Sequence, residues 1–472
     1  MATQNSSLLF GSVLLVLFFL CSLEETFGTA QYHNVQLSSL LPSSTCSPST
    51  KGPNKKTSLK VVHKHGPCSQ TKQEEPNAPT HIDILLQDQS RVNSIHSRLS
   101  STGGGGDVKK LDSTTLPAKS GSSIGSGNYI VVVGLGTPRN DLSLVFDTGS
   151  DLTWTQCEPC ARSCYKQKEP ILDPSKSTTY SNITCTNSLC SQLSSATGNT
   201  PKCAATTSTC IYGIQYGDSS FSIGYFAKET LTLPPNGVVP NYLFGCGQDN
   251  QGLFGGAAGL LGLGRNAISF VQQTALKYNK IFSYCLPATA SSTGYLSFGG
   301  GASNSVKYTS FSDISQGSSF YGIEIVGITV GGNKLSIPSS VFSSSGSIID
   351  SGTVITRLPS GAYGPLRTAF RQAMSKYPAV SGLSILDTCY DLSGYKSFEI
   401  PKISFLFGGG VSVDLASSGI VYVVSAKQVC LGFAANQDAG DVTIFGNVQQ
   451  KTLEIVYDVG GGRVGFGSAG CH

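Results

Sequence analysis

The chain has 472 residues, 55 of them glycine, with 13% charged residues and a formal net charge of +4. This length exceeds one ordinary hydrophobic core, so we expect two lobes and additional segments. The excess positive charge lies before residue 120, and the nearly neutral remainder gives no sign of a basic face for nucleic acid. Beyond residue 119 the only histidine is His472. A Ser-His-Asp triad, a Cys-His pair and a His-ligated zinc site are therefore excluded there.

The chain begins with a short apolar run, residues 8–20, followed by small residues at 28–30. The run is too short to cross a bilayer comfortably, so residues 1–30 are predicted to be a cleaved signal peptide. A membrane anchor is the alternative, although no second apolar span follows. The absence of Lys and Arg before the run departs from the usual pattern.

Residues 31–119 are rich in Ser, Lys and Pro. Residues 58–68 are predicted to form one strand. After Thr80, a possible helix cap, apolar residues recur at near-helical spacing and predict a helix. These residues are Ile82, Leu85, Leu86, Val92, Ile95 and Leu99. Residues 100–119 have the composition of a linker.

The same local pattern occurs twice further along the chain. An apolar run at residues 143–146 ends in Asp-Thr-Gly-Ser (147–150), and another at 347–349 ends in Asp-Ser-Gly-Thr (350–353). Each predicts a strand that delivers a carboxylate into a tight turn, in which glycine supplies backbone freedom. One such turn is commonplace, but two copies, each capping an apolar strand, indicate a paired site.

Asp147 and Asp350 are the candidate catalytic residues. Two adjacent carboxylates cannot both ionise, so they share a proton and titrate as a unit. One then acts as general base on water while the other, protonated, polarises a carbonyl. We expect the first hydroxyl of each turn to hold the loops together and the second to orient the outer carboxylate oxygens. The supporting residues are Thr148, Gly149, Ser150, Ser351, Gly352 and Thr353.

From about residue 127 to its end, the chain resembles the plant aspartic proteases of the pepsin family, in their cysteine-rich, nepenthesin-like branch. The resemblance implies an all-β, bilobal fold with a few short helices. It divides the rest of the chain into a prosegment (31–119), an N-terminal lobe with the first Asp loop, a Cys-rich insertion and a flap (120–310), and a C-terminal lobe with the second Asp loop (311–472). Proteolysis near residues 110–120 would release the mature enzyme.

Residues 211–224 alternate apolar and polar side chains around a turn and resemble the family's flap, a hairpin that closes over substrate. Tyr216, Gly217 and Asp218 are then the expected flap and substrate-binding residues. Without the Asp pair, Tyr216 would be an ordinary cross-strand aromatic. Residues 259–264 and 443–447 resemble the strands that complete the active-site sheet of each lobe. Residues 362–376 are predicted to form a helix.

Of 15 cysteines, Cys21, Cys46 and Cys68 precede the mature region and leave 12. An even number after a signal peptide favours disulfides over zinc, but spacing alone leaves their connectivity open. The resemblance implies the pairs Cys157–Cys160, Cys164–Cys246, Cys185–Cys210, Cys190–Cys203, Cys285–Cys471 and Cys389–Cys430. Asn182 begins an Asn-Ile-Thr acceptor for N-glycosylation.

The resemblance implies a secreted, monomeric endopeptidase, made as a zymogen, that hydrolyses proteins in acid without cofactor or metal. Its partners would be protein or peptide substrates and its own prosegment as inhibitor, with no nucleic acid and no membrane anchor. The apoplast is the expected location, with vacuole and chloroplast as alternatives. A glycosidase-inhibiting binding protein and a DNA-binding protease are competing functions. Protonation of the five prosegment histidines is a hypothetical trigger for maturation.

Overall fold

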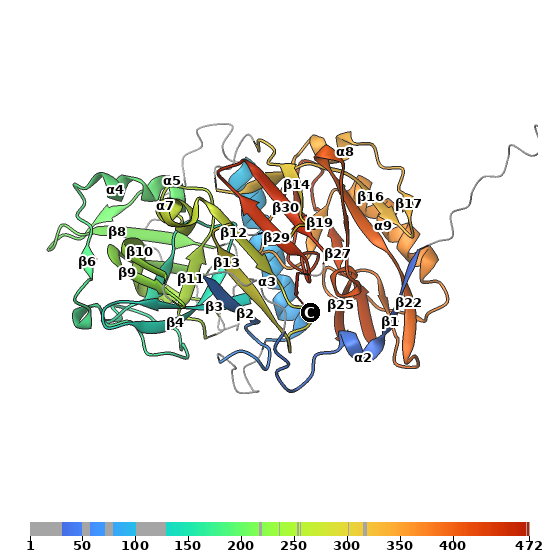
Figure 1. Cartoon of the computed structure of the whole chain (residues 1–472), viewed down its shortest axis with the longest axis horizontal. Coiled ribbons are helices and arrows are strands. Elements are labelled where there is room, and N and C mark those ends of the chain that lie inside the picture. Colours follow the sequence, from blue (N-terminus) through green and yellow to red (C-terminus); the bar gives the residue numbers. More distant parts are fainter. Residues whose placement is uncertain are drawn as a thin grey trace, which may run out of the picture.

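The computed structural model describes residues 31–49, 57–70, 79–100, 129–216, 220–235, 237–252, 254, 256–300, 302–314, 319–468 and 470–471. Two lobes built mainly from strands lie side by side (Figure 1). The strands from the middle of the sequence, in green, form one lobe, and most of the later ones, in orange, form the other. The expected all-β, bilobal fold is confirmed. The predicted signal peptide lies outside the described residues.

In its described residues, the leading segment contributes two strands and two α-helices before the lobes begin. These are β1 (Tyr32–Gln36), α2 (Leu37–Leu40), β2 (Ser58–His63) and α3 (His81–Ser100). The first lobe contains β3 (Tyr129–Leu135), β4 (Asn140–Asp147), β5 (Trp154–Gln156), β6 (Ser181–Asn182), β7 (Lys202–Cys203), β8 (Cys210–Gln215), β9 (Phe221–Leu233), β10 (Gly237–Gln251), β11 (Gly259–Gly262), β12 (Ile281–Cys285) and β13 (Thr293–Phe298). Its short α-helices are α4 (Ser188–Ser191), α5 (Leu193–Thr197), α6 (Phe270–Gln273) and α7 (Ala275–Tyr278).

The second lobe is also built mainly from strands, with few helices. Its strands are β14 (Lys307–Ser310), β15 (Tyr321–Ile323), β16 (Ile325–Val330), β17 (Asn333–Lys334), β18 (Ser347–Ile349), β19 (Thr356–Leu358), β20 (Ala379–Val380), β21 (Cys389–Tyr390), β22 (Ser397–Pro401), β23 (Ile403–Phe407), β24 (Val411–Asp414), β25 (Val421–Ser425), β26 (Gln428–Leu431), β27 (Phe433–Ala435), β28 (Thr443–Phe445), β29 (Glu454–Asp458) and β30 (Arg463–Gly467). Its α-helices are α8 (Ser340–Ser343), α9 (Ser360–Ala373) and α10 (Ser417–Ile420). The helix predicted at 362–376 is α9, which buries Phe370.

One fifteen-stranded sheet connects the two lobes. Strand β14 and the last two strands of the chain, β30 and β29, continue through β12 and β13 into β2 of the leading segment and then into β3 and β4 of the first lobe. Strand β2 is an internal member, with Leu59 opposite Leu296 of β13 and Val62 opposite Ile130 of β3. The leading segment is therefore part of the sheet that joins the lobes. The predicted strand at 58–68 ends at His63, because the chain turns after it.

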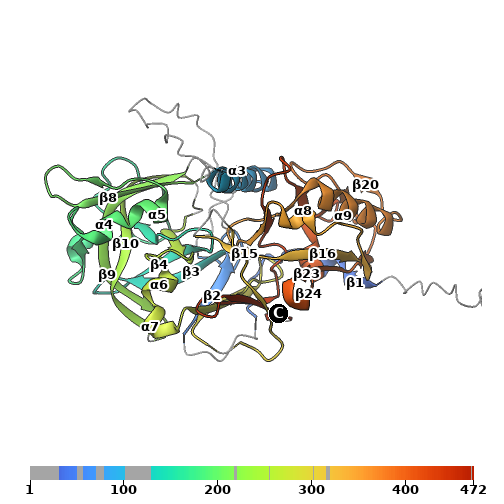
Figure 2. The ribbon, with the colours of Figure 1, turned by 90° about the horizontal axis from the view of Figure 1, so that it is seen from above.

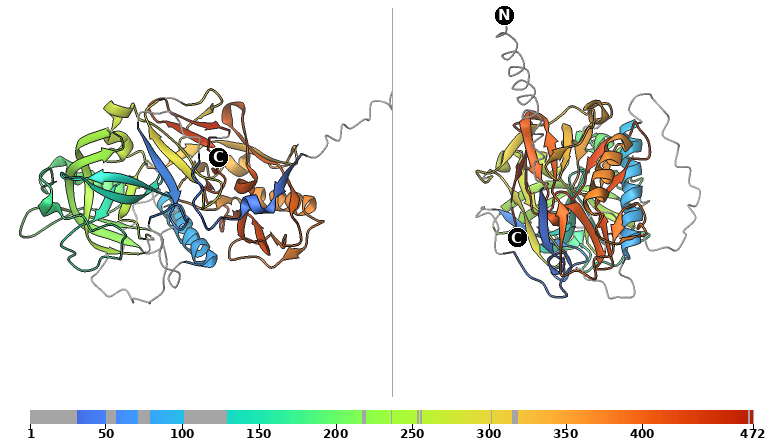
Figure 3. Two further views of the ribbon diagram at one scale, coloured as in Figure 1. Left: turned by 60° about the horizontal axis from the view of Figure 1, so that its bottom comes forward. Right: turned by 90° about the vertical axis from the view of Figure 1, so that its right-hand side faces the viewer.

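Helix α3 is the longest helix of the described chain, and it lies across the junction between the lobes (Figures 2 and 3). Its start is a reciprocal cap: the backbone N–H of Thr80 donates to Asp83 Oδ2 at 2.9 Å, and that of Asp83 donates to Thr80 Oγ1 at 3.2 Å. The helix predicted from the apolar period is thus confirmed. The buried apolar members are Leu85, Val92, Ile95 and Leu99, whereas Ile82 and Leu86 are exposed.

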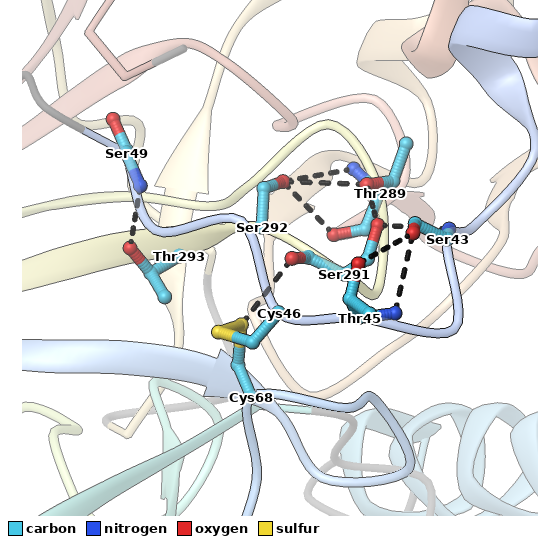
Figure 4. The surroundings of a disulfide bond; sticks show 9 residues. All are labelled: Ser43, Thr45, Cys46, Ser49, Cys68, Thr289, Ser291, Ser292 and Thr293. Carbon is cyan, nitrogen blue, oxygen red and sulfur yellow. Dashed lines mark hydrogen bonds between the residues drawn. A yellow bond between two sulfur atoms is a disulfide. The ribbon is translucent and has the colours of Figure 1, made fainter.

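A loop of the leading segment is closed by the Cys46–Cys68 disulfide and fastened to the turn before β13 (Figure 4). The backbone N–H of Ser49 donates to Thr293 Oγ1 at 3.0 Å. The backbone N–H of Ser43 donates to Ser291 Oγ at 3.1 Å. Together with β1, which pairs with β22, these contacts attach the segment to both lobes.

The fourteen described cysteines form seven disulfides, including the expected Cys285–Cys471 and Cys389–Cys430. The expected Cys157–Cys160 and Cys164–Cys246 bonds are wrong, because the structure joins Cys157 to Cys246 and Cys160 to Cys164. Strand β5 runs parallel to β10, so Cys157 donates its backbone N–H to Gly247 at 2.8 Å and lies beside Cys246.

The second difference in disulfide pairing lies in the Cys-rich insertion around α4 and β7. The structure joins Cys185 to Cys203 and Cys190 to Cys210, so the expected Cys185–Cys210 and Cys190–Cys203 pairs are wrong. All four cysteines share one cluster, because β7 and β8 place Cys203 opposite Cys210 and the backbone N–H of Cys185 donates to Ser208. Spacing along the chain does not distinguish partners within such a cluster.

Asn182 lies on the surface in the short strand β6, where its Oδ1 accepts a hydrogen bond from the Tyr180 hydroxyl at 2.6 Å. The side chain is exposed, as a glycan acceptor must be. Within the described ranges, no helix has the length and apolar character needed to cross a membrane.

Candidate active site

The two candidate catalytic aspartates occupy matching places in the two lobes. Asp147 is the last residue of β4, and Asp350 directly follows β18. Strand β4 pairs in parallel with β11, and β18 pairs in parallel with β28. The buried apolar side chains of these strands fix them in the core, so each strand carries its aspartate to the same point of the site. The duplication predicted from the sequence is present in the structure.

A reciprocal pair of hydrogen bonds joins the two Asp loops. The backbone N–H of Thr148 donates to Ser351 Oγ at 3.1 Å, and that of Ser351 donates to Thr148 Oγ1 at 2.9 Å. Both residues are buried, so each hydroxyl satisfies a backbone donor that water does not reach. The loops are thereby held in a fixed register across the interface of the lobes, as the sequence predicted.

Each carboxylate is also oriented within its own loop. The hydroxyl of Ser150 donates to Asp147 Oδ2 at 2.8 Å, and that of Thr353 donates to Asp350 Oδ2 at 2.6 Å. Backbone N–H groups two residues after each aspartate donate to its Oδ1, at 3.0 Å in the first loop and 3.2 Å in the second. These donors leave the two carboxylates facing the cleft in a nearly symmetrical arrangement.

The glycines of the two loops are required by close approach. A Cβ on Gly149 would lie 2.8 Å from Asp350 Oδ1, and one on Gly352 would lie 2.5 Å from Asp147 Oδ1. Neither glycine has a positive φ, so the backbone freedom expected for Gly149 is not what the turn uses. The missing side chains let each loop approach the opposite carboxylate.

Sequence reasoning missed Arg91, which lies on α3 between the two aspartates. Its Nη2 is 2.7 Å from Asp147 Oδ1 and 2.9 Å from Asp350 Oδ2, and its Nε donates to Asp350 Oδ2 at 3.1 Å. The guanidinium fills the space where a water would have to bind both carboxylates. The sequence offered one indication of its role: Arg91 is a charged residue next to Val92, one of the regularly spaced apolar residues that predict the helix.

Arg91 also sets the charge of the pair. Burial raises the pKa of Asp147, but the charge and hydrogen bonds of Arg91 outweigh burial and hold that pKa below its usual value. For Asp350, burial together with the charge of Asp147 outweighs Arg91 and raises the pKa. The two carboxylates therefore differ in proton affinity, as neighbouring acids that share a site do.

The predicted flap is a β-hairpin of β8 and β9, with Gln215 opposite Phe221. Tyr216 lies at its tip, and its hydroxyl accepts a hydrogen bond from Trp154 Nε1 at 2.8 Å. Phe254 packs edge-on against Trp154, with 4.9 Å between ring centroids. The other two expected flap residues, Gly217 and Asp218, lie outside the described residues.

A cavity of about 70 Å³ remains between α3, the flap and the first Asp loop. Its apolar wall includes Ile214, Phe254 and Leu260, and its polar end includes Asp147 and Ser150. An apolar pocket that ends at paired carboxylates can hold a hydrophobic side chain of a peptide while the carboxylates contact the adjoining peptide bond. The arrangement suits hydrolysis of a polypeptide.

Known proteins and protein families are similar to this chain over most of its length. The family model described as xylanase inhibitor N-terminal matches residues 129–300, and the one described as xylanase inhibitor C-terminal matches residues 320–468. An aspartyl protease family protein of Arabidopsis thaliana is 61% identical, over 93% of each chain. Aspartyl protease AED1 of the same plant is 52% identical, over 93% of this chain and 92% of its own.

Similarity extends to more distant proteins. Aspartic proteinase nepenthesin-2 of Nepenthes gracilis is 38% identical, over 74% of this chain and 78% of its own. The crystal structure of edgp matches with a TM-score of 0.59 at 20% identity, over 72% of this chain and 91% of its own. Basic 7S globulin from soybean matches with a TM-score of 0.58 at 20% identity, over 74% and 93%. These two structures share the fold.

Proposed function

The chain belongs to the aspartyl protease family and is an aspartic-type endopeptidase, and from that premise we propose that it is a secreted zymogen, active in acid once its prosegment is removed. The observation that carries the zymogen proposal is the contact of Arg91 with both aspartates, at 2.7 and 2.9 Å. A cation buried between the two acids keeps Asp147 hydrogen-bonded and occupies the site of the attacking water. The leading segment thus acts as an intramolecular inhibitor.

Removal of α3 gives Asp147 and Asp350 the environment that the reaction needs. Without the guanidinium, two buried carboxylates side by side hold one proton between them. The ionised member takes a proton from water, the protonated member donates a hydrogen bond to the peptide carbonyl, and the water oxygen attacks the carbonyl carbon. The shared proton is retained only in acid, so activity is expected to fall towards neutral pH. The hydroxyls of Ser150 and Thr353 keep the outer oxygens oriented throughout.

Acid also supplies a trigger for release of the segment. Burial and the positive charge of Lys451 lower the pKa of His63 on β2 to about 3, and burial lowers the pKa of His81 on α3. Because docking favours the neutral imidazoles, docking is fully stable above about pH 6.5 and weakens as pH falls below it. Burial lowers the pKa of His96 as well, but its ring lies 3.2 Å from the Asp441 carboxylate, which offsets part of that effect.

The proposal of secretion draws on the seven disulfides and on the predicted signal peptide. The apoplast is the proposed destination, with the vacuole and chloroplast as alternatives. Exposed Asn182 is the proposed glycan site.

The test uses the full chain, expressed for secretion and purified at neutral pH. The product is shifted to pH 3–7, its new N-terminus is determined, and cleavage of a denatured protein is measured with and without pepstatin. We expect loss of residues up to about 119 and acid activity that pepstatin abolishes. A correctly processed product without activity would instead favour a binding protein of this fold.

A further inference from the structure

A second charged contact between α3 and the second lobe lies beside the catalytic loop. Arg357 of β19 is completely buried, and its Nη2 lies 2.9 Å from Asp88 Oδ2 of α3. Its Nη1 donates to the backbone carbonyl of Ile355 at 2.7 Å, whereas its buried Nε has no partner. The guanidinium is therefore held by the second lobe itself and is directed towards the carboxylate that α3 inserts.

Backbone groups complete the surroundings of that carboxylate. The N–H of Val354 donates to Asp88 Oδ1 at 2.6 Å, and the N–H of Ile355 donates to Asp88 Oδ2 at 3.1 Å. Both residues immediately follow the loop of Asp350 and Thr353. We call Arg357 and these two N–H groups the carboxylate pocket. All of its donors belong to the second lobe, and only its occupant belongs to the leading segment.

The pocket loses its occupant when α3 leaves. Asp88 is the one acidic side chain within ion-pair distance of Arg357 in the part of the chain that the structure describes. The nearby acid Asp441 pairs instead with His96, at 3.2 Å. Once α3 has left, water is the acceptor for the guanidinium and the two backbone donors, and a carboxylate that restores the charge-assisted hydrogen bonds is favoured over water.

We propose that the carboxylate pocket is a substrate subsite of the mature enzyme that binds the side chain of Asp or Glu. This inference rests on the proposed removal of the leading segment. Asp88 precedes Arg91 by three residues, or about 4.5 Å along a helix. An extended peptide advances about 3.3 Å per residue. The acidic residue of a substrate therefore lies one or two positions from the scissile bond.

Matched peptides test this specificity. Each pair carries Glu or Gln at one position within three residues of the scissile bond, and kcat/KM is measured with the processed enzyme at pH 5.5 and pH 3. At one position we expect Glu to exceed Gln by about tenfold at pH 5.5, and the advantage to vanish at pH 3, where free Glu is protonated. Arg357→Gln is expected to remove the preference, and Arg357→Lys to retain part of it. Equal cleavage of every pair at pH 5.5 would overturn the subsite and leave the protease function intact.

A binding measurement decides the matter without relying on catalysis. A synthetic peptide of residues 81–100 is titrated into the processed protein at pH 5.5, beside the same peptide carrying Asp88→Asn or Gln89→Ala. Gln89 is the matched control, because its neutral Oε1 lies 3.3 Å from the same guanidinium. We expect Asp88→Asn to weaken binding by at least tenfold and Gln89→Ala to change it less than threefold. Equal affinity of the Asp88→Asn peptide would refute the pocket. Failure to cleave any peptide would refute the proposed function instead.

Discussion

Arg91 donates two hydrogen bonds to Asp147, from Nη2 to Oδ1 at 2.7 Å and from Nη1 to Oδ2 at 3.2 Å. Such a bidentate pair is strong and geometrically specific. It satisfies both oxygens of a carboxylate that must be free to take a proton from water. The same contact therefore stabilises the docked helix and prevents the chemistry.

Arg91→Gln is expected to produce activity in the unprocessed chain. Glutamine lacks the charge that holds the pKa of Asp147 down, so the helix is held less tightly and water and substrate reach the carboxylates more readily. Initial rates on a short fluorogenic peptide at pH 5.5, measured before any chain is cut, should rise at least tenfold over the unprocessed wild type.

Arg98→Gln is the matched control for this experiment. It removes the same charge from the same helix, but Arg98 lies over the ring of Phe320, 4.8 Å from its centroid, and makes no hydrogen bond to either aspartate in the described structure. Equal activation by both variants would mean that docking of the helix as a whole, rather than the Arg91 contact, controls the site.

Replacing either aspartate by asparagine should abolish turnover with little change in fold. Asp147→Asn and Asp350→Asn preserve shape and can still accept the hydrogen bonds of Ser150 or Thr353, but neither amide can exchange the reactive proton. We expect kcat to fall by at least a thousandfold, within the usual scale of general acid–base catalysis. Circular dichroism of the processed protein should match the wild type. Normal turnover by Asp350→Asn would remove it from the catalytic pair.

The Asp loops and α3 were predictable because their signals are local. An apolar strand followed by Asp, then Ser or Thr, then Gly can be recognised within about eight residues, as at Asp147 and Asp350. The helix followed from apolar spacing and from the Thr80 cap. Each of these features depends on neighbours in sequence, which pattern reasoning handles well.

The contacts of Arg91 and the partners of the cysteines were not predictable in the same way. The role of Arg91 depends on how α3 docks across two lobes, and no local pattern contains that placement. Cys185 and Cys190 lie in one cluster with both possible partners, so connectivity follows from the pairing of β7 with β8. The requirement for glycine at position 149 likewise depends on the close approach of the Asp350 carboxylate from the other lobe, which no local pattern contains.

The link between the loops predicts a stability effect. Thr148→Val leaves the buried N–H of Ser351 without its acceptor, which costs about 1–3 kcal/mol. Each kcal/mol lowers the melting temperature of a lobe of this size by about 2–4 °C. Scanning calorimetry of the purified chain should show a drop of several degrees. Thr148→Ser keeps the hydroxyl and is expected to lose less than half as much; an equal loss would assign the effect to the methyl group.

The last prediction concerns the pH at which the leading segment is released. His63 and His81 dock in the neutral form, with the cation of Lys451 facing His63, so substitution by Gln removes a proton-binding site that favours the released state. With fewer such sites, release should require a lower pH, and we expect the midpoint of activation of the double variant to fall by about half a pH unit or more. The midpoint is measured from the fraction processed after a fixed time at each pH between 3 and 7. His96→Gln is the comparison: burial lowers its pKa too, but the Asp441 carboxylate 3.2 Å from its ring offsets part of that effect, so we expect a smaller shift of the midpoint. An unchanged midpoint in the double variant would remove His63 and His81 as the trigger.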